Sequence, residues 1–86
     1  PSGAGRSPAT TIKFNLIESG DARLLIYNIK GQKVKTLMDC YMSPGRSEMI
    51  WNGKDDSGKP VGSGVYFYQL QVDGKSIASK KCLMLK

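Results

Sequence analysis

The feature that most constrains this chain is strict alternation of apolar and polar residues in short runs separated by turn signals. In TTIKFNL, Ile12, Phe14 and Leu16 point to one side of an extended chain, and VYFYQLQV repeats this pattern later. Asp73-Gly74 stands between two such runs. This dipeptide is the strongest short signal for a β-hairpin, because both turn positions need positive φ. No segment shows sustained helical periodicity, so the sequence predicts antiparallel β structure.

About seven short strands are expected, and this number with turns between them favours an all-β, immunoglobulin-like antiparallel β-sandwich. Both faces of ARLLIYNI are apolar, so this strand is expected at the centre of a sheet. Lys33, Lys35 and Lys80 are expected on edge strands, where charge discourages pairing with other chains. Residues 1–9 are predicted to be a flexible linker or an expression-derived segment, and residues 10–86 a single domain. The clearest strand segments are 10–16, 22–29, 33–38, 46–51, 65–72 and 76–86.

Size and charge narrow the class of protein. With 86 residues the chain has room for one core, and a domain of this size buries only about 60–65% of its unfolded surface. No apolar run approaches the roughly 20 residues of a membrane-spanning helix, so no membrane insertion is expected. The net charge of +6 suggests nucleic acid, but the thirteen basic residues are scattered, without a recognition-helix or RNA-binding motif. We therefore expect a monomer with no nucleic-acid partner.

The residue inventory argues against catalysis. The chain has no histidine, so Ser-His and Cys-His pairs are excluded. Among its seven acidic residues only Asp55 and Asp56 are adjacent, and neighbours along a chain rarely face one another as an acid–base couple. The sequence therefore predicts that the protein is not an enzyme and needs no cofactor.

The segment WNGKDDSGKPVGSGVY, residues 51–66, has two interpretations. Oxygen ligands on a glycine-rich loop are typical of calcium sites, which makes Asp55 and Asp56 weak candidate ligands. However, the segment lacks the spacing of an EF-hand. We favour a turn in which these carboxylates and Ser57 cap backbone N–H groups. The residues expected to mark the fold are Gly31, Trp51, Gly53, Asp55, Asp56, Gly58, Gly64 and Tyr66.

Cys40 and Cys82 form neither a CxxC motif nor a metal-binding set. In an oxidising compartment, a disulfide between them would close a loop of about 40 residues, which the chain-entropy model values at roughly 4 kcal/mol. Two separate buried thiols are at least as good an interpretation, because cysteine packs as a small hydrophobe.

Aromatic residues raise a further alternative, an adhesive or carbohydrate-binding module attached to a secreted enzyme. Tyr27, Tyr41 and Phe67 are candidates for outward exposure, where they could stack on sugars. Trp51 and Tyr66 fall at the inward phases of their strands, so core packing explains these two more simply.

Several segments together resemble two related families. They are SPATTIKFNLIESGDARLLIYNIKGQKVKTL, WNGKDDSGKPVGSGVYFYQLQ and KKCLMLK, which cover nearly everything from Ser7 to Lys86. One family is the C-terminal sorting domain of cargo proteins exported by the type IX secretion system. The other is the immunoglobulin-like domain of flagellar hook-capping proteins, which shares the tryptophan segment and is normally embedded in a longer assembly protein.

The sorting-domain resemblance implies a non-catalytic module that directs an upstream cargo domain through the outer-membrane secretion machinery to the cell surface or exterior, via the periplasm. It departs from the family at GAGRSP, where only Pro8 of the usual opening motif remains, and at Cys82, where an apolar residue is common. The hook-capping alternative explains the tryptophan segment equally well but not the ending KKCLMLK, so the sorting domain is the first expectation. Carried over by position, the sorting motif falls on Lys80, Lys81, Cys82, Leu83, Met84, Leu85 and Lys86.

Overall fold

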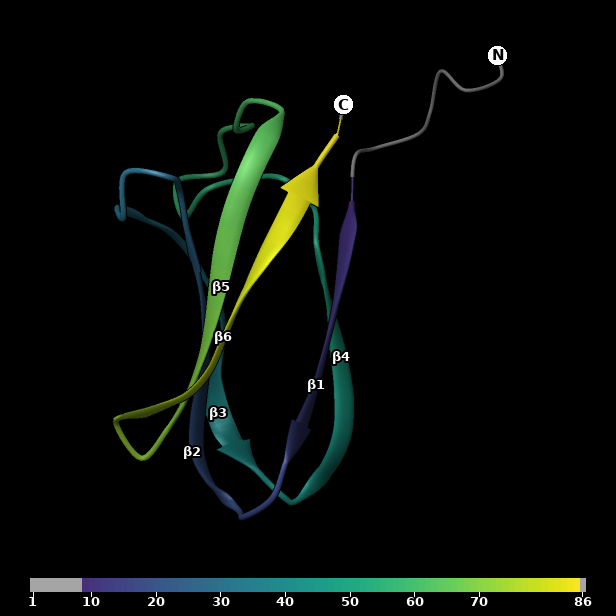
Figure 1. Ribbon diagram of the computed structural model, residues 1–86, viewed down its shortest axis with the longest axis vertical. Helices are drawn as coiled ribbons and strands as arrows, with labels where there is room; N and C mark the ends of the chain where they lie inside the picture. Colours follow the sequence, from purple (N-terminus) through teal and green to yellow (C-terminus); the bar gives the residue numbers. More distant parts are fainter. Residues whose placement is uncertain (1–8, 86) are drawn as a thin grey trace.

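The computed structural model describes residues 9–85, which form an all-β sandwich of two antiparallel sheets (Figure 1). Lys86 and residues 1–8 of the expected linker lie outside the described residues. Residues 9–85 contain no helix, and therefore no helix that is long and apolar enough to cross a membrane. The strands are β1 (Thr10–Leu16), β2 (Gly20–Tyr27), β3 (Lys33–Met42), β4 (Gly45–Trp51), β5 (Gly64–Val72) and β6 (Lys75–Met84).

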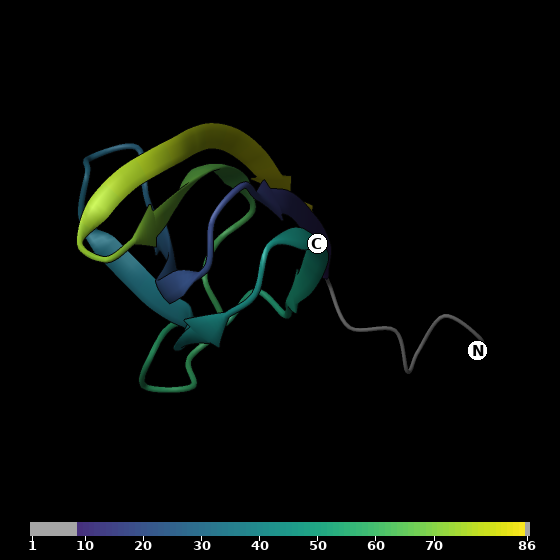
Figure 2. The ribbon, with the colours of Figure 1, turned by 90° about the horizontal axis from the view of Figure 1, so that it is seen from below.

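The strands divide into a two-stranded sheet, β1-β4, and a four-stranded sheet in the order β3-β2-β5-β6. Seen along the strands, the two sheets curve around a shared interior (Figure 2). The predicted fold class is confirmed, including the central position of β2. The described residues contain six strands where about seven were expected. The segment after β4, predicted to be a turn, forms the isolated bridge Lys54↔Pro60.

The core follows the alternation seen in the sequence. Along β1, Ile12, Phe14 and Leu16 are buried while the residues between them are exposed. In β4, only Trp51 is fully buried, and its ring meets that of Tyr66 edge-to-face at a centroid distance of 5.0 Å. These contacts join the two sheets through one aromatic pair. The other core side chains are Ala22, Leu24, Ile26, Met38, Tyr68, Leu70 and Met84.

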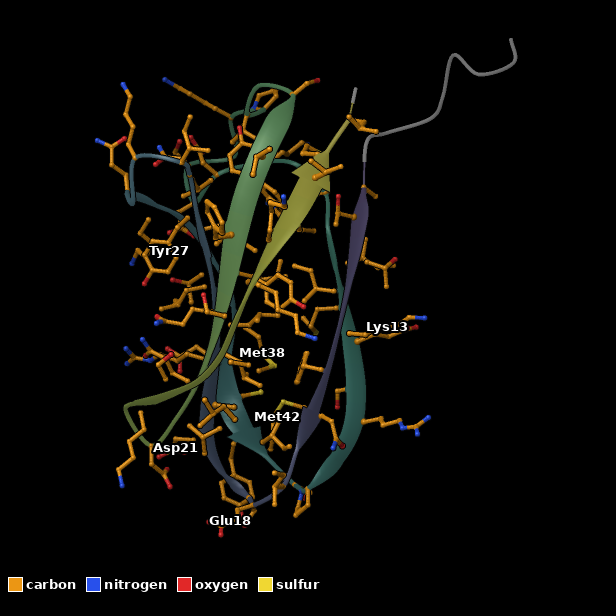
Figure 3. The ribbon with its side chains drawn as sticks, in the orientation of Figure 1. Lys13, Glu18, Asp21, Tyr27, Met38 and Met42 are labelled. Carbon is orange, nitrogen blue, oxygen red and sulfur yellow. The ribbon has the colours of Figure 1, made fainter. Side chains whose placement is uncertain are left out.

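The third strand is longer than the sequence indicates. The predicted segment ended at Met38, but β3 continues to Met42. Its register against β2 shifts between Leu24 and Leu25 and again between Ile26 and Tyr27. Both irregularities lie within Lys33–Met38. The added part of the strand keeps a regular register against β2, but Asp39-Cys40-Tyr41 has no apolar alternation that would indicate a strand. Met38 and Met42 nevertheless both point between the sheets (Figure 3).

The β5-β6 hairpin confirms the turn predicted at Asp73-Gly74. Asp73 has φ of 51° and Gly74 has φ of 82°, so both residues adopt the left-handed conformation of a type I′ turn. The Asp73 carboxylate accepts a hydrogen bond from the Asp21 backbone N–H at 2.9 Å, and the Asp73 N–H donates to the Asp21 carbonyl at 2.9 Å. The hairpin is therefore tied to the start of β2, at the lower end of Figure 3.

Candidate functional site

The segment between β4 and β5 crosses the end of the sandwich at which β1 begins, and its two aromatic ends hold it there (Figure 1). Trp51 Nε1 donates to the Lys54 carbonyl at 2.9 Å, and the Tyr66 hydroxyl donates to the Gly62 carbonyl at 2.7 Å. Each ring is buried while its polar atom reaches back to the connecting backbone. The core and the connection, here called the tryptophan loop (residues 52–63), therefore fix one another.

Gly53 brings the tryptophan loop close to β6. A Cβ atom at Gly53 would lie 3.1 Å from the sulfur of Met84, which is fully buried. Gly53 also has φ of 78°, a conformation that other residues rarely adopt. A side chain here would thus meet both a steric and a conformational obstacle. Positive φ occurs also at the predicted marker residues Gly31, Gly58 and Gly64.

The carboxylate of Asp55 organises the tip of the loop. Its Oδ1 atom accepts hydrogen bonds from the Ser57 hydroxyl at 2.7 Å, the Ser57 N–H at 2.9 Å and the Lys59 N–H at 3.0 Å. The hydrogen bond from the Ser57 side chain is the main cause that lowers the pKa of Asp55 below its ordinary value of 3.8, followed by the bond from the Lys59 backbone. The charged form of Asp55 is therefore part of the turn.

Asp56 instead joins the loop to the free edge of β3. Its N–H donates to the Val34 carbonyl at 3.1 Å, and its Oδ1 accepts from the Thr36 N–H at 3.0 Å. Asp56 thus satisfies backbone groups that would otherwise be open to another chain. Sequence analysis missed this role, because the hydrogen-bonding partners lie 20 residues apart and share no local motif.

These contacts support the turn interpretation over the calcium interpretation. One oxygen of Asp55 and one of Asp56 accept backbone N–H groups, so both carboxylates have a role in holding the backbone without a cation. Within residues 9–85 there is no group of three or more His, Cys, Asp or Glu residues suited to a metal ion. The two carboxylates also serve different contacts, so they do not converge on one point as an acid–base couple.

The turn that contains Gly31 lies beside the tryptophan loop. The Asn28 side-chain oxygen accepts hydrogen bonds from the N–H groups of Lys30, at 2.9 Å, and Gln32, at 3.0 Å. An open hollow separates this turn from Asp55 and Asp56, with the side chains of Val61 and Tyr66 also lining it. The two loops therefore form one end of the sandwich.

The residues of the predicted sorting motif are divided between core and surface. Met84 is fully buried and Cys82 is half-buried, whereas Lys80, Lys81, Leu83 and Leu85 are exposed. Lys86 lies outside the described residues. The strand that carries them, β6, is an edge strand of the larger sheet. Whether a secretion system recognises these residues stays a prediction.

The disulfide considered between Cys40 and Cys82 is not formed, and both cysteines are free. Cys40 lies on β3 and Cys82 on β6, the opposite edges of the four-stranded sheet. Two strands lie between them, so the cysteines are at least about three strand spacings, or roughly 14 Å, apart across the sheet, and they are also offset along the strands. This is too far to bridge. Burial raises the pKa of the Cys82 thiol, whereas Cys40 is exposed and not buried as the alternative had it.

The outward aromatic residues do not gather in one place. Tyr27 and Phe67 are opposite one another in the β2-β5 register, on the outer face of the larger sheet. Tyr41 is 65% exposed but pairs with Asp21 near the other end of β2. A single sugar-stacking platform of all three residues is therefore absent, and carbohydrate binding stays a prediction.

Two comparisons with known proteins agree on the fold and on the kind of domain. A family model described as the FlgD Ig-like domain matches residues 3–76. The crystal structure of FlgD from P. aeruginosa superposes with a TM-score of 0.68 at 26% sequence identity, covering 88% of this chain. This chain spans only 61% of the length of that structure. The search of curated proteins found no match.

Proposed function

Because the chain belongs to the FlgD Ig-like domain family, we propose that it is a non-catalytic, hook-capping-type assembly module that works as part of a longer protein. The family match over residues 3–76 carries this proposal. The FlgD structure from P. aeruginosa supports it, since this chain corresponds to only part of that protein.

The contacts of the described residues support a structural role. The adjacent carboxylates, which are the nearest approach to an acid–base pair in the sequence, stabilise a turn and cover a strand edge. The buried Trp51 and Tyr66 fix the connection between the sheets through their hydrogen bonds. Such a rigid sandwich with a fixed end loop is suited to positioning neighbouring domains or subunits.

The assembly role can be tested on the full-length parent protein. Size-exclusion chromatography with light scattering and chemical cross-linking of cell extracts would compare the parent with a version from which residues 9–85 are deleted. We expect the intact parent to enter a multisubunit assembly and the deleted version to be absent from it. An assembly that forms equally well without the module would overturn the proposal.

The second candidate function, type IX sorting, is favoured by one observation. Lys81 and Leu83 lie on an edge strand and their side chains are exposed, so these side chains are open to recognition by a partner. In this proposal the partners are the outer-membrane secretion machinery and an upstream cargo domain. The cargo would pass through the periplasm to the cell surface or exterior.

Deletion of the sorting residues is a poor test of sorting, because it would also remove the buried Met84. The double variant Lys81→Glu with Leu83→Glu changes only exposed positions. In a full-length cargo we expect this variant to stay in the periplasm, while the matched edge variant Lys33→Glu on β3 is exported. Circular dichroism of both variants checks that the domain folds. Normal export of the folded double variant would contradict the sorting role.

A further inference from the structure

Two free strand edges face one another on one side of the sandwich. Among residues 9–85, β1 pairs only with β4 and β6 only with β5, so within this part of the chain each strand has one edge without a ladder of backbone hydrogen bonds. The two strands meet where the Thr10 hydroxyl donates to the Leu83 carbonyl at 2.6 Å. From that point they diverge toward the lower end in Figure 1, and the end-on view in Figure 2 shows the same separation. An opening between β1 and β6 is thus bordered by two unpaired edges.

The lower part of this opening is largely apolar. A hollow of about 300 Å³ lies between the end of β1 and the start of β6, where Val72 and Ala78 form part of its wall and Asn15 and Glu18 are its polar lining residues. Two isoleucines at its rim are unusually exposed for their type, Ile17 at 85% and Ile77 at 49%. Insertion of another chain would remove part of this apolar surface from water.

The outer border of the opening is basic. A second hollow, which shares Asn15 with the first, lies over β1 and its neighbour β4 and is also lined by Lys80 of β6. Its charged residues are Lys13, Arg46 and Lys80 and the single carboxylate of Glu48. In the part of the chain that the structure describes, one ion pair is found, between Arg23 and Asp39. Lys13, Arg46 and Lys80 do not take part in it. Lys13 points away from the interior (Figure 3), beside the path that an added strand would follow along β1.

The pattern of the two surfaces specifies the occupant. A strand added to β1 would place alternate side chains toward the core, next to the apolar wall, and the others outward, next to Lys13, with Arg46 one strand further away on β4. Inward positions would therefore favour apolar residues and outward positions acidic ones. Backbone hydrogen bonds to the free edges would supply affinity, and the alternating side chains specificity.

Two other occupants fit poorly. Residues 1–8, PSGAGRSP, contain two prolines, two glycines and an arginine but no acidic residue, which suits neither a strand nor the basic hollow. A second copy would bring its own net charge of +6 to the same basic side. We propose that the opening between β1 and β6 receives an extended segment of a partner protein in which apolar and acidic residues alternate. This inference rests on the assembly role proposed above, for which it names a class of partner.

A direct binding measurement tests this site separately from assembly. The ¹⁵N-labelled full chain would be titrated with a synthetic peptide of alternating valine and glutamate, about as long as the seven residues of β1. A second peptide has lysine in place of glutamate. We expect saturable amide shifts confined to β1 and β6, with at least about tenfold weaker binding of the lysine peptide.

Charge reversal then locates the contact. The exposed substitutions Lys13→Glu and Lys80→Glu should each weaken the glutamate peptide and strengthen the lysine peptide. Lys81→Glu is the matched control. Lys81 follows Lys80 on β6 and points to the opposite face of the strand, so this variant should retain most of the affinity for the glutamate peptide. The proposal is overturned by an absence of shifts at about 1 mM peptide, by shifts centred elsewhere, or by equal binding of both peptides. Amide shifts that grow with protein concentration in the absence of peptide would indicate that a second copy of this chain occupies the opening. That result would also overturn the proposal.

Discussion

At the scale of single residues, Asp55 makes the tryptophan loop sensitive to acid. Its folded-state pKa is below the ordinary value of 3.8, first because of the Ser57 hydroxyl and then the Lys59 N–H. A depressed carboxylate pKa contributes stability that is present above 3.8 and lost as the pH falls through the folded-state value. We expect the amide shifts of Ser57 and Lys59 to titrate together with a midpoint below 3.8.

NMR spectra recorded from about pH 6 to about pH 2 check this expectation. The variant Asp55→Asn is the control, and its Ser57 amide should show no such titration. A midpoint at or above 3.8, or unlinked movements of the Ser57 and Lys59 amides, would show that the Asp55 carboxylate does not organise the turn.

The two cysteines should differ in reactivity. Cys40 is exposed, whereas burial raises the pKa of the half-buried Cys82 and so reduces the thiolate fraction that reacts. At pH about 8 we expect iodoacetamide to modify Cys40 at least about tenfold faster than Cys82, as measured by mass spectrometry of timed samples. In denaturant the two rates should become similar. Equal rates in the folded protein would contradict the arrangement of β6.

At the scale of strands, the sequence predicted side-chain direction better than strand length. The alternation in β1, β4 and β5 correctly placed their inward residues, because each of these strands keeps a two-residue repeat. In β3 the repeat is interrupted by shifts in register against β2. The segment Asp39-Cys40-Tyr41 has no apolar alternation of its own and is extended because β2 provides its partners. A pattern within one segment contains no information about such pairing.

The edge of β3 offers a prediction at this scale. Asp56→Ala removes the acceptor of the Thr36 N–H, and the expected cost is about 1 kcal/mol in the free energy of unfolding. The Thr36 amide should also exchange faster with solvent. Asp39→Ala is a matched control, because Asp39 lies on β3 with Thr36 and its ion pair with Arg23 is exposed. This substitution should cost less than about 0.5 kcal/mol in the free energy of unfolding.

Urea denaturation measures both free energies, and hydrogen exchange followed by NMR reports on Thr36. Equal destabilisation by Asp56→Ala and Asp39→Ala, with unchanged exchange at Thr36, would show that the tryptophan loop does not protect this edge.

At the scale of the whole molecule, local contacts were predictable from sequence and long-range ones were not. The turn around Asp55 involves residues up to four positions away, so its chemistry is visible in the local sequence. The contact of Asp56 with β3 and the opening between β1 and β6 arise only when separate strands are placed in space. The tryptophan segment is common to the two resembled families, and the family match ends at Ser76, before the predicted sorting residues. The shared pattern therefore predicts the fold of the domain better than its function.

The stability of the whole domain depends strongly on Trp51. This side chain is fully buried, contacts Tyr66 edge-to-face and donates to the Lys54 carbonyl. Trp51→Ala should therefore cost about 3–5 kcal/mol through the cavity and the lost contacts. At roughly 0.05–0.15 kcal/mol per residue, a domain of this size has only about 4–13 kcal/mol of total stability. At the lower end of this range the variant would be partly or wholly unfolded, and at the upper end it would stay folded with a stability reduced by about 3–5 kcal/mol.

The neighbouring Ile50→Ala provides the control for Trp51→Ala. Ile50 is 64% exposed on the same strand, and its removal should change the free energy of unfolding by no more than about 0.5 kcal/mol. Urea denaturation followed by circular dichroism compares both variants without relying on tryptophan fluorescence. A cost below about 1 kcal/mol for Trp51→Ala would mean that the two sheets hold together without the Trp51–Tyr66 contact. If the large cost is observed instead, the geometry of sheet and loop depends on a single aromatic residue, because the same side chain fills the core and fixes the loop that protects β3.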